Sequence, residues 1–130
     1  MDVSKIKKIL VVNPFGIGDV VFSFALVEAL KELPSSPRVD FLCNERTDEL
    51  VGLNPAIQER FVFNRDHLKH LFSTDKRLFF KELKSLLTRL RQERYDVLFD
   101  LSMGKEYAFF LMCLGIRKRI GFDYKGRGLF

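Results

Sequence analysis

Ile9-Leu-Val-Val-Asn-Pro-Phe-Gly-Ile-Gly-Asp19 is the stretch of this 130-residue chain that decides its fold. Its first four residues are aliphatic and mostly β-branched, which is typical of a central parallel strand buried on both faces. Asn13, Pro14 and two glycines then predict a tight loop, and Asp19 is expected to open a helix. Open α/β sheets form their sites at the carboxyl ends of such strands. We therefore expect a functional site at this loop.

The rest of the chain alternates short apolar runs with helical patterns. Further strands are predicted at 39–43, 61–63, 96–101 and 118–122, and helices at 19–33, up to 53, 78–94 and 105–114, the last capped by Gly115. The first helix is expected to be amphipathic, with Val20 and Val21 on its apolar face, and the Phe and Leu stripes are expected to form the core. The polar segment 64–77 is predicted to be a loop with one turn of helix. This order predicts an α/β, Rossmann-like domain over residues 1–130, with a parallel sheet and helices on both faces.

Composition limits the partners and the compartment. A net charge of +5 favours an anionic partner, whether a phosphorylated sugar, a lipid headgroup or a nucleic acid. Cys43 and Cys113 lie in apolar segments without CxxC spacing, so we expect two buried free thiols, no disulfide and no zinc. No apolar stretch approaches the ~20 residues of a spanning helix. We expect a cytoplasmic protein with at most peripheral membrane contact.

The Gly loop fits neither common nucleotide motif. Gly16 and Gly18 lack the third glycine of the dinucleotide fingerprint, because Val21 stands in its place, and no Lys-Ser or Lys-Thr follows as in a P-loop. The glycines are explained either by a tight turn between strand and helix or by a ligand-binding site. Asp19 is open to two interpretations as well, a helix N-cap or a general base. These roles conflict, because a carboxylate that accepts hydrogen bonds is a weaker base.

Three further segments extend the pattern of the first strand. They are Gly18-Asp-Val-Val21 at the helix start, Tyr95-Asp-Val-Leu-Phe-Asp-Leu101 and Arg119-Ile-Gly-Phe122. In this order they strongly resemble the amino-terminal half of the heptosyltransferases of glycosyltransferase family 9. The resemblance spans nearly all of the chain, and the Gly-Asp helix start is its most specific element.

The resemblance implies an inverting GT-B enzyme of two Rossmann-like domains, of which this chain is the amino-terminal, acceptor-side one. Such enzymes transfer heptose from ADP-heptose to the inner core of lipopolysaccharide without a metal, and the family's catalytic Asp falls on Asp19, as general base. The family often has Gln-Gly after the fourth strand, where this chain has Ser102-Met103-Gly104. Leu129 and Phe130 end the chain with nothing to bury them. We therefore expect a truncated enzyme without its donor-binding domain, inactive alone.

Candidate substrate contacts lie in the loops at the predicted site. They are Asn13, Gly16, Gly18, Ser102, Lys105, Lys125 and Arg127. The basic residues of 64–77 are further candidates for binding the phosphates of an anionic acceptor, with a solvated surface as the simpler interpretation of each. His67 and His70 lack carboxylates or cysteines to complete a metal site, so no metal or cofactor is expected.

The expected partners are a lipopolysaccharide core or lipid A acceptor, ADP-heptose through the missing domain, and the periphery of the inner membrane. A second class of function remains open: a non-enzymatic nucleotide- or phosphate-binding α/β domain that uses the Gly16 to Gly18 loop as an anion cradle. A nucleic-acid binder rests on charge alone, and the chain lacks interleaved exposed aromatics and any known motif for it. No nucleic acid is therefore expected as a partner.

Overall fold

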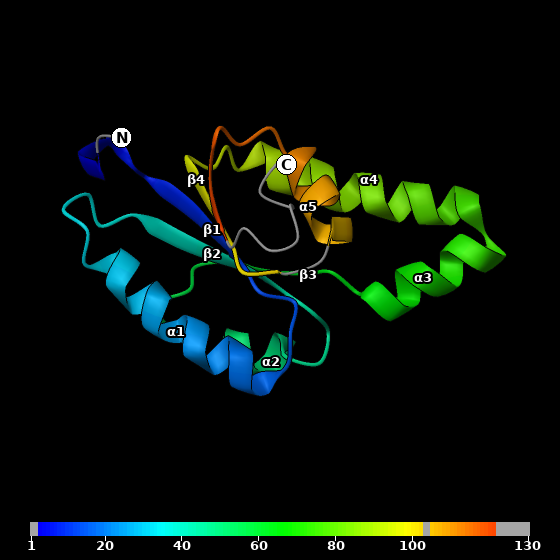
Figure 1. Ribbon diagram of the computed structural model, residues 1–130, viewed down its shortest axis with the longest axis horizontal. Helices are drawn as coiled ribbons and strands as arrows, with labels where there is room; N and C mark the ends of the chain where they lie inside the picture. The colour runs from blue at the N-terminus through cyan, green and yellow to red at the C-terminus, as the bar shows by residue number, and fades with distance from the viewer. Residues whose placement is uncertain (1–2, 103–104, 122–130) are drawn as a thin grey trace.

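The computed structural model describes residues 3–102 and 105–121, which form a parallel β-sheet covered by helices (Figure 1). The strands are β1 (Lys8–Val12), β2 (Arg38–Cys43), β3 (Arg60–Val62), β4 (Val97–Asp100) and β5 (Lys118–Gly121). The helices are the 3-10 turn η1 (Val3–Lys5), α1 (Ile17–Lys31), α2 (Asp48–Gly52), α3 (Arg65–Thr74), α4 (Lys76–Gln92) and α5 (Lys105–Met112). All four strand pairs are parallel, as the sequence predicts.

Strand β1 is buried on both faces of this sheet. Ile9 and Val11 belong to one core cluster, which includes side chains from α1 and α2. Leu10 and Val12 belong to a second cluster, which includes side chains from α4 and α5. The run of consecutive aliphatic residues is therefore explained by a strand between two helical layers. The expected α/β fold with helices on both faces is confirmed.

The strand order places a change of direction beside β1. The order is β3-β2-β1-β4-β5, so the chain first adds strands on one side of β1 and then crosses over to add β4 and β5 on the other. In the register, Val12 of β1 faces Leu42 of β2 and Asp100 of β4. In parallel sheets the loops leave such a switch point in opposite directions, which opens a crevice at the carboxyl edge.

Helix α1 differs from the prediction at its start and on its surface. It begins at Ile17, and Gly16 occupies the N-cap without any side-chain hydrogen bond, so Asp19 is neither the opening residue nor the cap. Asp19 instead lies in the first helical turn. The predicted apolar face is also wrong in part, because Val21 is 50% exposed and Phe22 is 83% exposed.

The segment 64–77, predicted to be a loop with one helical turn, forms α3 and the start of α4. The side chain of Asn64 accepts a hydrogen bond from the His67 N–H at the start of α3, and Asp75 accepts one from the Leu78 N–H at the start of α4. Leu68 and Leu71, three residues apart, are the buried face of α3. The segment's high charge obscured these two caps and this short apolar repeat.

A buried carboxylate links neighbouring segments at the amino edge of the sheet. Asp40 of β2 is fully buried and accepts two hydrogen bonds from the Arg38 guanidinium, both 3.0 Å long. It also accepts the Tyr95 hydroxyl at 2.5 Å and the Glu59 N–H at 3.1 Å. Burial and the bond to Asp40 hold the pKa of the Tyr95 hydroxyl far above its usual value, so this group stays a donor.

Two more carboxylates close the same edge. Asp96, next to Tyr95, accepts the backbone N–H groups of Lys7 and Lys8 at 2.8 and 3.0 Å. Glu93 pairs with the Lys8 ammonium at 3.0 Å, which lowers the pKa of Glu93. The Tyr-Asp pair of the fourth strand thus joins β4 to β1 and β2 at their amino ends.

The two cysteines differ in exposure, and the predicted burial is right for only one of them. Cys43 is a free, buried thiol, and burial raises its pKa to about 11, as suits an inert core residue. Cys113 is free as expected but is exposed, because it follows α5 in the turn that ends at Gly115. Gly115 has a φ of 71°, the left-handed conformation expected of the residue after a helix.

Candidate functional site

Two buried asparagines shape the carboxyl edge of the sheet. Asn13 follows β1 and is 3% exposed, and its side chain accepts the Phe15 N–H and donates to the backbone oxygen of Asp19. Asn44 follows β2 and donates to the carbonyls of Pro14 and Phe15, while its oxygen accepts the N–H groups of the loop after β2. The loop after β1 is therefore braced by Asn13 and joined to the loop after β2 by the Asn44 side-chain amide.

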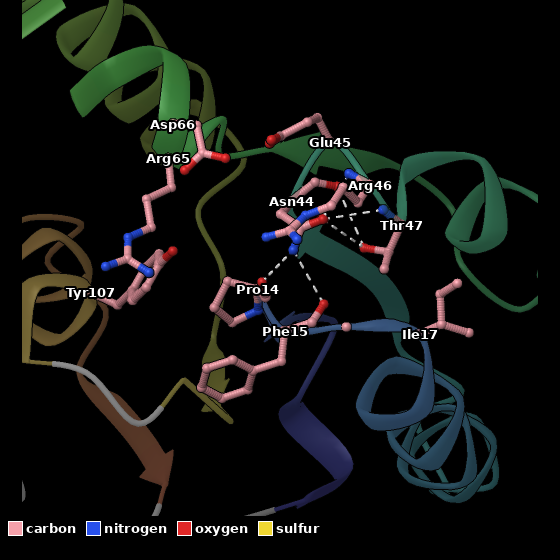
Figure 2. A pocket seen from close by; sticks show the side chains of 11 residues that line it. Pro14, Phe15, Ile17, Asn44, Glu45, Arg46, Thr47, Arg65, Asp66 and Tyr107 are labelled. Atoms are coloured by element: carbon pink, nitrogen blue, oxygen red, sulfur yellow. Dashed lines mark hydrogen bonds between the residues drawn. The ribbon is translucent and has the colours of Figure 1, made fainter. Parts of the chain in front are cut away.

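A pocket of about 400 Å³ lies between these loops, α3 and α5 (Figure 2). Arg46 enters its wall from the loop after β2, and Arg65 enters from the first turn of α3 and reaches toward Tyr107 of α5. Glu45 and Asp66 are the acidic residues of the lining. The pocket thus presents two guanidinium groups, which suit a phosphate or carboxylate ligand because each can donate in a planar fork.

Arg46, Asn44 and Tyr107 were not predicted to be site residues. Arg46 and Asn44 follow β2 directly, and the carboxyl ends of neighbouring parallel strands meet at one edge, so their position was available from the strand pattern. Of the basic residues in the segment 64–77, only Arg65 lines this pocket. Lys69 and Lys76 are exposed further along the helices and do not line it.

Asp19 lines a second hollow, of about 330 Å³, on the other side of the loop after β1. This hollow includes Asn13, directly after β1, and Leu101, directly after β4, so it lies at the switch point of the sheet. Phe15 lines both hollows. The acidic residue and the two arginines are thus in adjoining depressions that share one aromatic wall.

The Asp19 carboxylate is accessible to solvent. It is exposed, and no hydrogen bond or ion pair links it to another residue in the described part of the chain. Its position in the first turn of α1 places it at the positive end of the helix dipole. The conflict between capping and base catalysis does not arise, because this carboxylate caps nothing.

Neither glycine of the loop is required by the backbone. Gly16 has φ −77° and ψ −176°, which any residue can adopt, and Gly18 does not have a positive φ. A Cβ added at either position would meet no atom within 4 Å. Tight-turn geometry therefore does not explain these glycines, and the open space above them is available to a ligand.

The other predicted contacts lie at the end of β4 or beyond. Ser102 is fully buried, and its hydroxyl donates to Asp100 at 2.5 Å, so this side chain braces the strand end. Lys105 is the first residue of α5. Lys125 and Arg127 lie outside the described residues. Substrate contacts by these four residues stay predictions.

In the part of the chain that the structure describes, no three His, Cys, Asp or Glu side chains gather where they could bind a metal ion. His67 is paired with Glu82 at 3.0 Å. Among the same residues, no helix has the length and apolarity needed to cross a bilayer.

Solved structures share this fold. The chain matches ADP-heptose LPS heptosyltransferase II of Escherichia coli with a TM-score of 0.72 and 24% identity over 93% of its length. It matches a glycosyl transferase family 9 protein of Veillonella parvula with a TM-score of 0.70 and 14% identity over 88%. It matches Escherichia coli heptosyltransferase WaaC, solved with ADP-2-deoxy-2-fluoro heptose, with a TM-score of 0.69 and 18% identity over 88%.

The chain spans about a third of the length of these proteins, 32%, 32% and 34% respectively. No protein-family model matches the chain, and no curated protein sequence matches it. At these identities the match establishes the fold. The family resemblance inferred from the sequence is thus confirmed at the level of the fold.

Proposed function

We propose that this chain is the acceptor-side domain of an inverting heptosyltransferase of glycosyltransferase family 9, with Asp19 as its general base. The donor is ADP-heptose and the acceptor is the inner core of lipopolysaccharide. The observation that carries the proposal is an exposed, unpaired carboxylate at the switch point of a sheet whose fold is that of heptosyltransferases. Three sequence segments that resemble the same family support it independently.

The reaction needs one base near the acceptor. The acceptor hydroxyl oxygen attacks the anomeric carbon of the heptose and forms the new glycosidic bond. The bond between that carbon and the phosphate oxygen breaks, and ADP leaves with the electron pair. The hydroxyl proton becomes acidic as the new bond forms and passes to Asp19. In this proposal no metal takes part, because N–H donors and cations stabilise the departing ADP.

The arginine pocket supports an anionic acceptor. Arg46 and Arg65 line a depression that adjoins the Asp19 hollow, so an acceptor whose anionic group binds both guanidinium groups extends past Phe15 toward the carboxylate. The open space over Gly16 and Gly18 leaves room for a sugar at this point. The enzyme would act in the cytoplasm, with its acceptor at the inner membrane, and the donor would bind chiefly to the domain that follows this one.

The test is Asp19→Asn in the complete enzyme. The variant removes the base and leaves the shape of the side chain, so transfer from ADP-heptose should fall at least 100-fold, at the low end of what general bases contribute. Glu28→Gln, on the same helix and exposed, is the matched control and should keep its turnover. Thermal unfolding should be the same for all three proteins. Turnover near that of the wild type in Asp19→Asn would refute the role of this residue.

A second function, binding of a free nucleotide or phosphate without catalysis, is favoured by the open Gly loop alone. It predicts that the 130-residue chain binds a mononucleotide in calorimetry and that Gly18→Ala weakens this binding. The heptosyltransferase proposal predicts instead that the chain binds the anionic acceptor, weakly, and transfers no sugar alone. Competition between acceptor and mononucleotide would show whether both use one pocket.

A further inference from the structure

The junction of α3 and α4 carries an exposed aromatic cluster far from the site. We call Phe72, Leu78, Phe79 and Phe80 the aromatic tip. The rings of Phe72 and Phe79, and those of Phe79 and Phe80, have centroids 5.1 Å apart. Phe72 is 49% exposed, Phe80 is 58% exposed and Leu78 is 37% exposed. A group of large apolar side chains that touch one another and face solvent marks a surface that binds something.

The tip extends beyond the sheet. Helix α4 buries only Leu86 and Leu90, both in its second half, where they join the cluster under the sheet. Its first turns, from Lys76, pack on α3, and Figure 1 shows the junction of the two helices at the end of the molecule away from the sheet. The aromatic tip can therefore contact a flat surface, whereas a residue inside a hollow could not.

Cations surround the tip. Residues 69–81 contain four Lys or Arg and one acid, Asp75, whose side chain is occupied in capping α4. Lys76, Arg77 and Lys84 lie three or four residues from Phe80 along α4 and so share its side of the helix. The Lys76 ammonium also lies 5.1 Å from the centre of the Phe72 ring. Apolar rings and flexible cations thus occupy the same end of the hairpin.

We propose that the aromatic tip docks the protein on an anionic lipid bilayer. Phe72, Leu78 and Phe80 enter the interfacial region, while the charged ends of the surrounding Lys and Arg side chains bind lipid phosphates. Each basic residue near a charged membrane strengthens binding about five-fold, so several together give selectivity for anionic lipid. The inference does not depend on glycosyl transfer, since it uses none of the residues of the Asp19 and arginine hollows.

The observations favour a bilayer over a protein or nucleic acid. The surface combines apolar rings with flexible cations, whereas a helix-binding partner needs a groove, and the tip aromatics line neither the arginine pocket nor the Asp19 hollow. A nucleic acid offers no apolar interior in which the Leu78 side chain could be buried. Dimerisation through the tip would bring like charges together, which costs stability.

The first experiment uses fluorescence, because the chain contains no tryptophan. Phe80→Trp places a single reporter on the tip, and Phe22→Trp places one on α1, at a residue that is more exposed. With vesicles containing a quarter phosphatidylglycerol, the emission of Phe80→Trp should shift to shorter wavelength and that of Phe22→Trp should not. A shift at Phe22→Trp alone, or at neither position, would overturn the proposal.

The second experiment measures binding by vesicle sedimentation. Lys76→Gln/Arg77→Gln/Lys84→Gln should bind anionic vesicles at least ten-fold more weakly, and Phe72→Ser/Phe80→Ser should also lose at least ten-fold. The charge-matched control, Arg91→Gln/Arg117→Gln/Lys118→Gln, changes exposed cations elsewhere and should bind within two-fold of wild type. An equal loss of vesicle affinity in the control variant would show that net charge alone attracts the protein to the membrane, and it would refute docking through the aromatic tip. The bilayer proposal would be refuted if the wild-type protein formed dimers that Phe72→Ser/Phe80→Ser abolishes. It would also be refuted if the protein bound DNA more tightly than anionic vesicles.

Discussion

The two edges of the sheet use polar residues in opposite ways. At the amino edge, Asp40 is buried and accepts four hydrogen bonds, including those of Arg38 and Tyr95. At the carboxyl edge, the Asp19 carboxylate is exposed and bonds to no described residue, and Gly16 leaves the first turn of α1 without a side-chain cap. One carboxylate has every partner supplied by the fold, and the other has none.

This difference separates stability from chemistry. Paired and buried polar groups are costly to break, because the partner that remains is left without a hydrogen bond. Unpaired groups at a strand end contribute little to stability, and their hydrogen-bonding capacity is available to a ligand. The contrast can be tested by substitutions at each edge, in order of the expected effect.

Asp40→Ala should have the largest effect. It leaves the Tyr95 hydroxyl and the Arg38 guanidinium without their shared partner, and breaking a buried pair in this way costs about 3–5 kcal/mol. Urea unfolding measures the loss. The matched control is Asp48→Ala, which breaks a pair with Arg60 at the surface and should cost less than ~1 kcal/mol. Equal losses in the two variants would remove the distinction between the edges.

Gly121→Ala should have the next largest effect. A Cβ at this position would lie 2.7 Å from the backbone oxygen of Asp100 on the neighbouring strand, so β4 and β5 must move apart. Such overpacking costs about 1–3 kcal/mol, measured as a lower midpoint in urea. Gly16→Ala, where the added Cβ meets no atom within 4 Å, is the control and should not lower the midpoint.

Gly18→Ala should have the reverse sign. The position is helical and open, so alanine reduces the freedom of the unfolded chain and should stabilise the protein by about 0.4–1 kcal/mol. Under the proposed function, the same methyl group should also raise the KM of the complete enzyme for a substrate that lies over the loop. If Gly18→Ala stabilises the protein and leaves the KM unchanged, this glycine has no role in substrate binding.

Lys8→Gln should have the smallest effect, and it depends on pH. Lys8 lowers the folded-state pKa of Glu93, so the pair stabilises the fold above the unfolded-state pKa of this carboxyl. That contribution is lost as the pH falls through the lowered pKa. The two side chains are partly exposed, so the variant should lose about 0.2–1 kcal/mol near neutral pH and nothing in strong acid. A difference that grows on acidification would contradict this assignment.

The fold was predictable because its strands are local and strongly apolar. All five strands and four of the five α-helices that the structure describes follow from runs such as Ile9 to Val12 and from the leucines of α4. Helix α3 was missed, since its two caps and its Leu68 and Leu71 repeat are diluted by charge. Exposure of Val21 and Cys113 depends on which neighbours cover a helix, and that is decided by tertiary packing.

The candidate site was predictable only in part. Its place follows from the β1 strand and Gly loop. Asn44 and Arg46 enter it because β2 pairs with β1, and the strand pattern indicates that the two strands share an edge without indicating which side chains face the pocket. The N-cap interpretation of Asp19 was wrong because the helix begins two residues earlier, at Ile17. Helix starts are set within a residue or two by loop geometry, and here the Asn13 side chain fixes that loop.

The position of β1 also has a consequence for biosynthesis. Its neighbour β2 follows soon after it, but its other neighbour, β4, is reached much later, as the separation of 89 residues between Lys7 and Asp96 indicates. A ribosome that adds roughly 5–20 residues per second takes roughly 5–20 seconds to cover that interval. For that time the nascent chain presents one edge of its most apolar strand unpaired, which is the kind of surface that chaperones recognise.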